Sequence, residues 1–283
     1  MDSFGPLVDV AWLRSRLGDP DLVVVDCRWT LGDPGAGRAL YESGHVPGAA
    51  FMDVERELSA PAGDAARGRH PLPDASDFQA DARRAGISGD TRVVAYDEAG
   101  EGGAARLWWL LRHFGHEGAA ILDGGAAAWR AAGGPLEHGH AGTGAGDFKA
   151  RPRDDDVALL AEVRERAPAD DGSLVLIDAR APERFRGDTE PVDPVAGHIP
   201  GAANVPFASL APDGRFLGRD ELQERLTAAG AIPGADVVAY CGSGVTAAVV
   251  VAAAEAAGIE GVRLYAGSWS EWCRQGLPAD TGP

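Results

Sequence analysis

Residues 44–50 of the chain read GHVPGAA, and residues 197–203 read GHIPGAA. Each heptapeptide comes after a short apolar run that ends in aspartate: LVVVD at residues 22–26 and LVLID at residues 174–178. The same two motifs therefore occur in the same order in both halves of the chain. Recurrence at a long, fixed spacing is typical of an internally repeated fold.

Two further pairs of segments extend the repeat toward the C-terminal side of each heptapeptide. VVAYD at residues 93–97 corresponds to VVAYC at residues 237–241. LDGGAAAW at residues 122–129 corresponds to LYAGSWSEW at residues 264–272. Four matched pairs in one order predict that the two halves are copies of a single fold.

The apolar runs are about five residues long and lack polar alternation, which is typical of strands covered on both faces. Helical segments lie between them, such as residues 104–114 and 221–229, and Gly115 and Gly230 follow where a helix would end. We therefore expect an α/β fold with two similar domains, each a mostly parallel sheet with helices on both faces.

The sequence around residues 132–147 is rich in glycine and has no periodicity, which predicts a linker between the two copies. We place the N-terminal domain at residues 1–138, the linker at 139–155 and the C-terminal domain at 156–283.

The net charge of −17 argues against nucleic acid or an anionic membrane as a partner, because phosphate binding needs clustered basic residues. It is compatible with a small anionic substrate, which responds to local groups. Residues 246–257 are apolar but too short to span a bilayer. Residues 1–10 do not resemble a signal peptide, so we expect a cytoplasmic protein.

The chain has three cysteines, Cys27, Cys241 and Cys273, without CxxC spacing. This favours neither a disulfide framework nor a zinc site, and we expect no metal. Cys241 stands where the first copy has Asp97.

The residues after Cys241 are Gly-Ser-Gly-Val-Thr, between a strand that ends at Tyr240 and a helix that begins near Thr246. Two glycines allow the loop to curl and turn its N–H groups inward, toward a positive helix end. Such a loop favours a thiolate and would stabilise the anionic outer sulfur of a persulfide. We interpret Cys241 as a sulfur nucleophile rather than a buried structural cysteine.

CGSGVT at residues 241–246, together with the paired GH(V/I)PGAA and VVAY segments, resembles the tandem-domain rhodaneses, in particular their 3-mercaptopyruvate sulfurtransferase branch. The resemblance extends from about Leu7 to Pro278. It implies a non-catalytic N-terminal copy, a catalytic C-terminal copy and persulfide chemistry without a cofactor. The N–H groups of the loop, from Gly242 through Gly244 and Val245 to Thr246, are expected to bind the transferred sulfur, and Thr246 is also expected to cap the following helix.

The resemblance also bears on the sulfur donor. Thiosulfate-preferring members carry Arg and Lys after the cysteine, whereas Gly242 and Ser243 are neutral and small. Arg184 matches the family's substrate-binding arginine, which suits the carboxylate of mercaptopyruvate. In mercaptopyruvate enzymes a second arginine follows a Glu-Pro pair, but here Val192 follows. This departure leaves thiosulfate open as the donor.

Ser243 is expected to donate a hydrogen bond to the substrate carbonyl or to pass a proton to the departing enolate. The resemblance suggests that His45 orients Ser243, with Asp33 as a third member of this group. His198 occupies the place of His45 in the second repeat, so both histidines could instead brace the GHxPG turn. Trp269 is expected either to line the pocket or to pack in the core. Arg180 is expected to form a structural ion pair, and Cys273, near the C-terminus, is expected to be exposed.

The resulting hypothesis is a ping-pong sulfurtransferase that takes sulfur from 3-mercaptopyruvate and passes it to thioredoxin, a small thiol or cyanide. Two alternatives remain: a thiosulfate sulfurtransferase and a non-catalytic persulfide-binding scaffold. A phosphatase is disfavoured, because Ala247 stands where a phosphate-binding arginine would be required.

Overall fold

The computed structural model describes residues 4–61, 67–139, 144–167 and 173–282. The chain divides into two compact units, of which the first contains residues 1–60, 73–153 and 213–216, and the second contains residues 61–72, 154–212 and 217–283. Segment 61–72 thus belongs to the second unit, although in the sequence it lies between two segments of the first unit. The domain limits expected from the sequence remain predictions, and residues 140–143 of the predicted linker lie outside the described residues.

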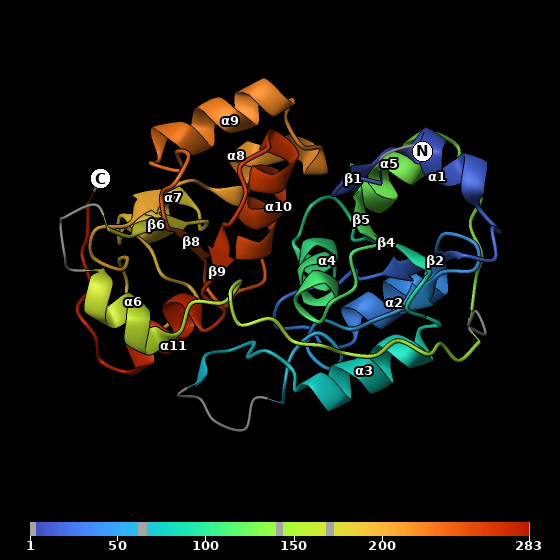
Figure 1. The fold of residues 1–283 in the computed structure, drawn as a ribbon, viewed down its shortest axis with the longest axis horizontal. Helices are drawn as coiled ribbons and strands as arrows, with labels where there is room; N and C mark the ends of the chain where they lie inside the picture. Colours follow the sequence, from blue (N-terminus) through green and yellow to red (C-terminus); the bar gives the residue numbers. More distant parts are fainter. Residues whose placement is uncertain (1–3, 62–66, 140–143, 168–172, 283) are drawn as a thin grey trace. The chain divides into compact units, whose positions relative to one another are not determined.

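The first unit contains a parallel sheet in the order β1-β5-β4-β2-β3 (Figure 1). Its strands are β1 (Leu7–Val8), β2 (Leu22–Asp26), β3 (Ala50–Phe51), β4 (Arg92–Tyr96) and β5 (Ala119–Leu122). Its helices are α1 (Val10–Arg16), α2 (Ala36–Ser43), α3 (Ala75–Arg84), α4 (Gly103–His113) and α5 (Gly125–Ala131).

The second unit contains a parallel sheet in the order β7-β6-β8-β9. Its strands are β6 (Val175–Asp178), β7 (Ala203–Asn204), β8 (Val237–Tyr240) and β9 (Arg263–Leu264). Its helices are α6 (Leu160–Arg166), α7 (Pro182–Phe185), α8 (Phe207–Leu210), α9 (Arg219–Ala228), α10 (Ala247–Ala257) and α11 (Ser268–Arg274). In Figure 1, α8, α9 and α10 lie on one side of this sheet, and α6 and α11 lie on the other.

The register of the strands repeats as the sequence does. Val25 pairs with Ala50 in the first sheet, and Ile177 pairs with Ala203 in the second, so the last alanine of each heptapeptide occupies the same place. The helices predicted at residues 104–114 and 221–229 are confirmed as α4 and α9 to within about two residues. The apolar runs of the two repeats are confirmed as the strands β2, β4, β6 and β8. Gly230 ends α9 with a φ of 95°, a backbone conformation that glycine adopts without strain.

A buried polar network lies at the carboxyl end of the central strands of the second sheet. Arg180 forms an ion pair with Asp178 at 2.6 Å, which confirms the structural role expected for it. Its Nη2 also donates to the carbonyl of Gly197, and Tyr240 Oη accepts from the N–H of Ile199. Asp26, Arg28 and Tyr96 form the corresponding network in the first unit. The network fixes the GHxPG turn against the end of the strand that precedes Cys241.

The core beneath the C-terminal loop is apolar and closely packed. Val163, Leu176, Val238, Trp269 and Trp272 are at most 2% exposed and belong to one buried cluster. Such a core holds the loop after β8 on a rigid base. None of the helices in the described parts of the chain combines the length and apolar character needed to cross a membrane.

Candidate active site

Cys241 lies at the carboxyl end of β8, the edge of a parallel sheet at which α/β proteins bind ligands. It is 2% exposed, and the N–H of Gly244 donates a hydrogen bond to its Sγ at 3.1 Å. Gly244 has a φ of 80°, and a Cβ there would lie 2.4 Å from the carbonyl oxygen of Ala266. Only glycine fits this position, because a side chain would collide with backbone and the loop would have to open.

The start of α11 fixes the other side of the loop. Ser268 Oγ accepts a hydrogen bond from the N–H of Cys241 at 3.1 Å. The N–H groups of Trp269 and Ser270 donate to the carbonyls of Cys241 and Gly242, each at 2.9 Å. Ser268 itself has a φ of 54°, a conformation that non-glycine residues adopt rarely and at functional sites. The Gly-Ser-Trp segment thus holds the backbone of the cysteine loop.

The side chain of Ser243 points to a histidine that the sequence analysis did not identify. Its Oγ lies 2.7 Å from Nδ1 of His70, and both residues are buried. His70 belongs to the segment 61–72, which is part of the second unit. A serine hydroxyl that is hydrogen-bonded to an imidazole can pass a proton to or from a neighbouring group.

His70 was missed because its segment has no counterpart in the second repeat. The connection from β3 to β4 comprises 40 residues (52–91), whereas the one from β7 to β8 comprises 32 (205–236). This difference in length was the available signal that the first copy carries an additional segment. The serine and its histidine are separated by 173 positions, so sequence spacing alone does not connect them.

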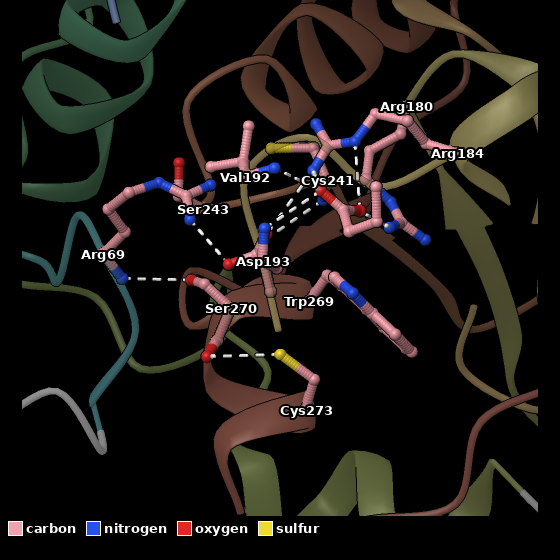
Figure 2. A network of polar contacts seen from close by, with 12 residues as sticks. Arg69, Arg180, Arg184, Val192, Asp193, Cys241, Ser243, Trp269, Ser270 and Cys273 are labelled. Carbon is pink, nitrogen blue, oxygen red and sulfur yellow. Dashed lines mark hydrogen bonds and ion pairs between the residues drawn. The ribbon is translucent and has the colours of Figure 1, made fainter. Parts of the chain in front are cut away.

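Arg184 belongs to a cluster of charged residues beside the cysteine loop (Figure 2). Its Nη2 lies 2.7 Å from Oε1 of Glu190 and 3.4 Å from Oδ2 of Asp193, whose Oδ1 lies 2.7 Å from Nη1 of Arg69. Burial acts to raise the pKa of Glu190, but the hydrogen bonds from Arg184 and from two backbone N–H groups outweigh it, and the net shift is downward. The carboxylate is therefore ionised at neutral pH.

Gly242 lies directly against this cluster. A Cβ at Gly242 would be 3.1 Å from Nη2 of Arg69 and 3.5 Å from Nη1 of Arg184. The two guanidinium groups therefore reach the residue that follows Cys241. Arg184 stands where the sequence analysis expected a substrate-binding arginine.

Trp269 is a core residue. It is fully buried, its Nε1 donates to the carbonyl of Val195 at 2.9 Å, and Arg180 lies over its ring at 4.8 Å from the centroid. Of the two roles considered for Trp269, the contacts favour packing. Val245 is likewise buried in the loop, at 2% exposure.

The contacts of His45 differ from those expected for a residue that orients Ser243. His45 Nδ1 lies 2.8 Å from the carbonyl of Tyr41, and its ring stacks on Tyr41. His198 repeats this arrangement, with Nδ1 2.8 Å from the carbonyl of Phe185 and its ring stacked on Phe185. Both histidines therefore brace the GHxPG turn, and the histidine bonded to Ser243 is His70.

Asp33 lies in an exposed turn, and Thr246 lies where the cysteine loop meets α10. Asp33 is exposed, and its Oδ1 accepts from the N–H of Gly35 at 3.2 Å within its own turn. Thr246 occupies the N-cap position of α10, but among the described residues its side chain makes no capping hydrogen bond. The expected cap is therefore wrong, because Thr246 already has helical backbone angles there (φ −73°, ψ −16°).

The loop after β4 in the first unit corresponds to the cysteine loop, and its N–H groups bind the carboxylate of Asp97. Oδ1 of Asp97 accepts from the N–H of Gly100 at 2.7 Å, and Oδ2 accepts from the N–H groups of Gly102 and Ala104 at 3.0 and 3.2 Å. Burial raises the pKa of Asp97, and these hydrogen bonds act in the opposite direction. The carboxylate of Asp97 thus occupies the place that the side chain of Cys241 has in the second repeat.

The other two cysteines are buried. Cys27 is fully buried, and burial raises the pKa of its thiol well above the usual value. Cys273 is 6% exposed, which corrects the expectation that it is exposed, and its thiol donates only a long contact of 3.9 Å to the carbonyl of Ser270. Burial, followed by the charge of Asp193, raises the pKa of Cys273. Both thiols are therefore poor nucleophiles.

The fold and the loop define a class of protein: a tandem α/β protein whose second unit holds a cysteine in a glycine-containing loop after a central strand. The model of the rhodanese-like domain matches residues 9–132 and 159–275 of the chain. The chain belongs to the rhodanese family, with two copies of its domain, as the resemblance implied.

Several relatives match nearly the whole chain. The "Probable 3-mercaptopyruvate sulfurtransferase" of Pseudomonas aeruginosa is 46% identical over 274 residues, covering 95% of both chains. The "Putative thiosulfate sulfurtransferase SseB" of Mycobacterium tuberculosis is 49% identical over 258 residues, covering 91% of this chain and 89% of the relative. The crystal structure of SseA from Escherichia coli, titled as a 3-mercaptopyruvate sulfotransferase, superimposes with a TM-score of 0.83 at 34% identity, over 94% of this chain and 99% of that one. The chain is accordingly a sulfurtransferase.

Proposed function

We propose that the chain transfers sulfur from 3-mercaptopyruvate to a thiol acceptor through a persulfide on Cys241. The observation that carries this proposal is the Sγ of Cys241, which accepts a hydrogen bond from the N–H of Gly244 inside a small, neutral loop. Cys27 and Cys273 are buried thiols with raised pKa values, so they do not compete for this role.

The Asp97 loop supports binding of a persulfide anion at Cys241. Gly244 follows Cys241 by three positions, as Gly100 follows Asp97, and both N–H groups donate to the side chain before them. In the first unit a second oxygen accepts from the N–H of Gly102, whose counterpart in the repeat is Thr246. We infer that the N–H of Thr246 faces the outer sulfur of the persulfide. Hydrogen bonds from backbone N–H groups to an anion are worth about 1.5–3 kcal/mol each.

The first half-reaction begins when the thiolate of Cys241 attacks the donor sulfur. The new S–S bond forms as the bond between sulfur and the methylene carbon of mercaptopyruvate breaks. The electron pair of that bond remains on the pyruvate fragment as an enolate, which takes a proton and leaves as pyruvate. Ser243 supplies this proton, and His70, 2.7 Å from its Oγ, replaces it.

The second half-reaction returns the enzyme to its starting state. A thiolate acceptor attacks the outer sulfur, the S–S bond breaks, and its electron pair returns to Cys241 as the thiolate. Thioredoxin or a small thiol fits this step, and cyanide would take the sulfur as thiocyanate. The acceptor needs only a nucleophilic sulfur or carbon that reaches the loop.

The donor assignment rests on the charges around the loop. Gly242 and Ser243 add no positive charge next to Cys241. Glu190 binds the Nε and Nη2 groups of Arg184, and Nη1 of Arg184 lies toward Gly242, where it can donate to a carboxylate of the donor. Mercaptopyruvate matches this arrangement because its single carboxylate lies two carbons from its sulfur.

Thiosulfate remains a second candidate donor. One relative of 49% identity is named as a thiosulfate sulfurtransferase, and two guanidinium groups lie beside Gly242 rather than one. A non-catalytic persulfide-binding protein is a third possibility, which sustained turnover would eliminate.

The test is a steady-state comparison of 3-mercaptopyruvate and thiosulfate as donors, with cyanide and a dithiol as acceptors. We expect a higher kcat/KM with mercaptopyruvate, and no turnover in Cys241→Ser. Higher activity with thiosulfate would reverse the donor assignment. Turnover in Cys241→Ser would overturn the mechanism.

A further inference from the structure

Three charged side chains of the second unit, Arg69, Arg184 and Asp193, form what we call the arginine cluster (Figure 2). The Asp193 carboxylate is completely covered, whereas the side chains of Arg69 and Arg184 are each 18% exposed. One carboxylate is thus held by two guanidinium groups, through contacts of 2.7 and 3.4 Å. The cluster already shows that it can bind a carboxylate from two sides.

The arginine cluster lies next to the nucleophile. Nη2 of Arg69 and Nη1 of Arg184 are 3.1 and 3.5 Å from where a Cβ of Gly242 would be, and Gly242 follows Cys241 directly. Because Gly242 has no side chain, both guanidinium groups lie directly against the loop backbone that follows Cys241. A carboxylate bound there would place an attached thiol close to the sulfur of Cys241.

The backbone at Arg69 is fixed in place. Gly68 has a φ of 86°, and a Cβ on it would lie 2.7 Å from the carbonyl oxygen of Gly267. The N–H of Arg69 donates to Ser270 Oγ at 3.0 Å. These contacts hold Arg69 against the start of α11, the helix that also holds the cysteine loop.

Arg69 retains an unused donor. Its Nε is buried and has no hydrogen-bond partner among the described residues. A buried donor without a partner destabilises the fold, so native structures rarely contain one without a reason. A bound anion would provide the missing acceptor.

From these contacts we propose that Arg69 acts with Arg184 as the second guanidinium of the subsite for the donor's carboxylate, and that Asp193 limits the negative charge that the subsite accepts. The inference rests on the proposed function and deepens it, by identifying residues that select the donor. It also accounts for Val192: the second arginine comes from segment 61–72 rather than from the position after Glu190-Pro191.

The role of Asp193 follows from its charge. Asp193 is shared by Arg69 and Arg184, whereas Glu190 is shared by Arg184 and Arg180. Replacing Asp193 with Asn removes one negative charge and keeps an oxygen that can accept from Arg69. Coulomb energy is proportional to ligand charge, so a dianion gains twice as much as a monoanion. Thiosulfate is a dianion, whereas mercaptopyruvate with a protonated thiol is a monoanion.

Steady-state kinetics of three variants test both parts of the proposal. Arg69→Met should raise KM for mercaptopyruvate about tenfold with little change in kcat, the loss expected for one charge-assisted hydrogen bond. Arg69→Lys should recover part of it. Asp193→Asn should raise the ratio of kcat/KM for thiosulfate to that for mercaptopyruvate by about tenfold. Asp188→Asn is the matched control, because Asp188 is an exposed carboxylate of the same connection, paired with Arg186.

A second experiment examines the subsite without a sulfur donor. Iodoacetate and iodoacetamide both alkylate the Cys241 thiolate, which displaces iodide from the same methylene carbon, but only iodoacetate has a carboxylate. Arg69→Met should lower the iodoacetate rate about tenfold and leave the iodoacetamide rate unchanged. Peptide mass spectrometry would assign the alkylation to Cys241.

The outcomes separate this inference from the proposed function. If Arg69→Met and Asp193→Asn match the Asp188→Asn control in both donor kinetics and alkylation selectivity, the subsite is refuted. If the native chain does not turn over mercaptopyruvate but Arg69 still determines the preference for iodoacetate, the subsite stands and the donor assignment fails.

Discussion

Gly244→Ala tests whether the conformation of the cysteine loop is required for sulfur transfer. The substitution forces a side chain into a backbone of φ 80° and places its Cβ 2.4 Å from the carbonyl oxygen of Ala266. The left-handed conformation alone costs a non-glycine residue about 1–2 kcal/mol. Relief of the collision must also move the Gly244 N–H away from Sγ of Cys241, where it now donates at 3.1 Å.

The loss of this hydrogen bond gives the size of the effect on catalysis. A hydrogen bond to a charged sulfur is worth about 1.5–3 kcal/mol, which corresponds to a decrease in kcat/KM of about 10- to 150-fold. Gly234→Ala is the matched control. Gly234 has a φ of 84°, but a Cβ there would meet nothing within 4 Å. It should lose about 1–2 kcal/mol of stability and keep full activity.

The assay combines sulfur transfer from mercaptopyruvate to cyanide with thermal unfolding of both variants. The expected pattern is a similar backbone penalty in each variant, with a further loss of stability and a large loss of activity only in Gly244→Ala. Full activity in Gly244→Ala would refute the reasoning, because the hydrogen bond to Sγ would then have no role in stabilising the sulfur anion.

Three further predictions follow from individual contacts. His70→Asn should lower kcat about 100-fold through loss of proton transfer, whereas His45→Asn should lower thermal stability and leave kcat unchanged; equal loss of kcat in both would contradict the assignment to His70. Burial and two neighbouring carboxylates raise the pKa of Glu101 to about 7, so its contribution to stability is complete below pH 4.5 and is lost as the pH rises through about 7. Glu101→Gln should therefore raise the Tm at pH 8 relative to the native chain but not at pH 4, and a difference that does not depend on pH would count against this explanation. Cys273→Ser should retain turnover because this buried thiol has a raised pKa, and a large loss of kcat would assign Cys273 a part in sulfur transfer beside Cys241.

The repeat in the sequence was sufficient to predict the architecture. Buried strands produce apolar runs, and glycines such as Gly230 mark helix ends, so these elements could be located from residue patterns alone. The position of Cys241 followed because a glycine-containing loop between a strand and a helix constrains its backbone locally. Both are short-range properties of the chain.

The rest of the site depends on contacts between distant segments. His70 and Arg69 lie in a segment without a repeat counterpart, and they reach Ser243 and Asp193 across 173 and 124 positions. No local pattern encodes such contacts. The family resemblance suggested His45, yet the same histidine recurs as His198, and both rings stack in their own unit next to the GHxPG turn.

The surroundings of individual side chains could also not be predicted from the sequence. Cys273 is close to the C-terminus in sequence, but α11 turns it into the core beside Trp269 and Trp272. Thr246 has a residue type that favours capping, but its helical backbone angles keep the hydroxyl from that role. In both cases tertiary structure overrides a local preference.

The most direct test of the account is to treat the protein with 3-mercaptopyruvate in the absence of an acceptor and to measure both pyruvate and protein mass. The account predicts one pyruvate released per chain and the mass of one additional sulfur atom on the peptide that contains Cys241, removed again by cyanide. Pyruvate release without added sulfur, or sulfur carried by Cys27 or Cys273 instead, would contradict it.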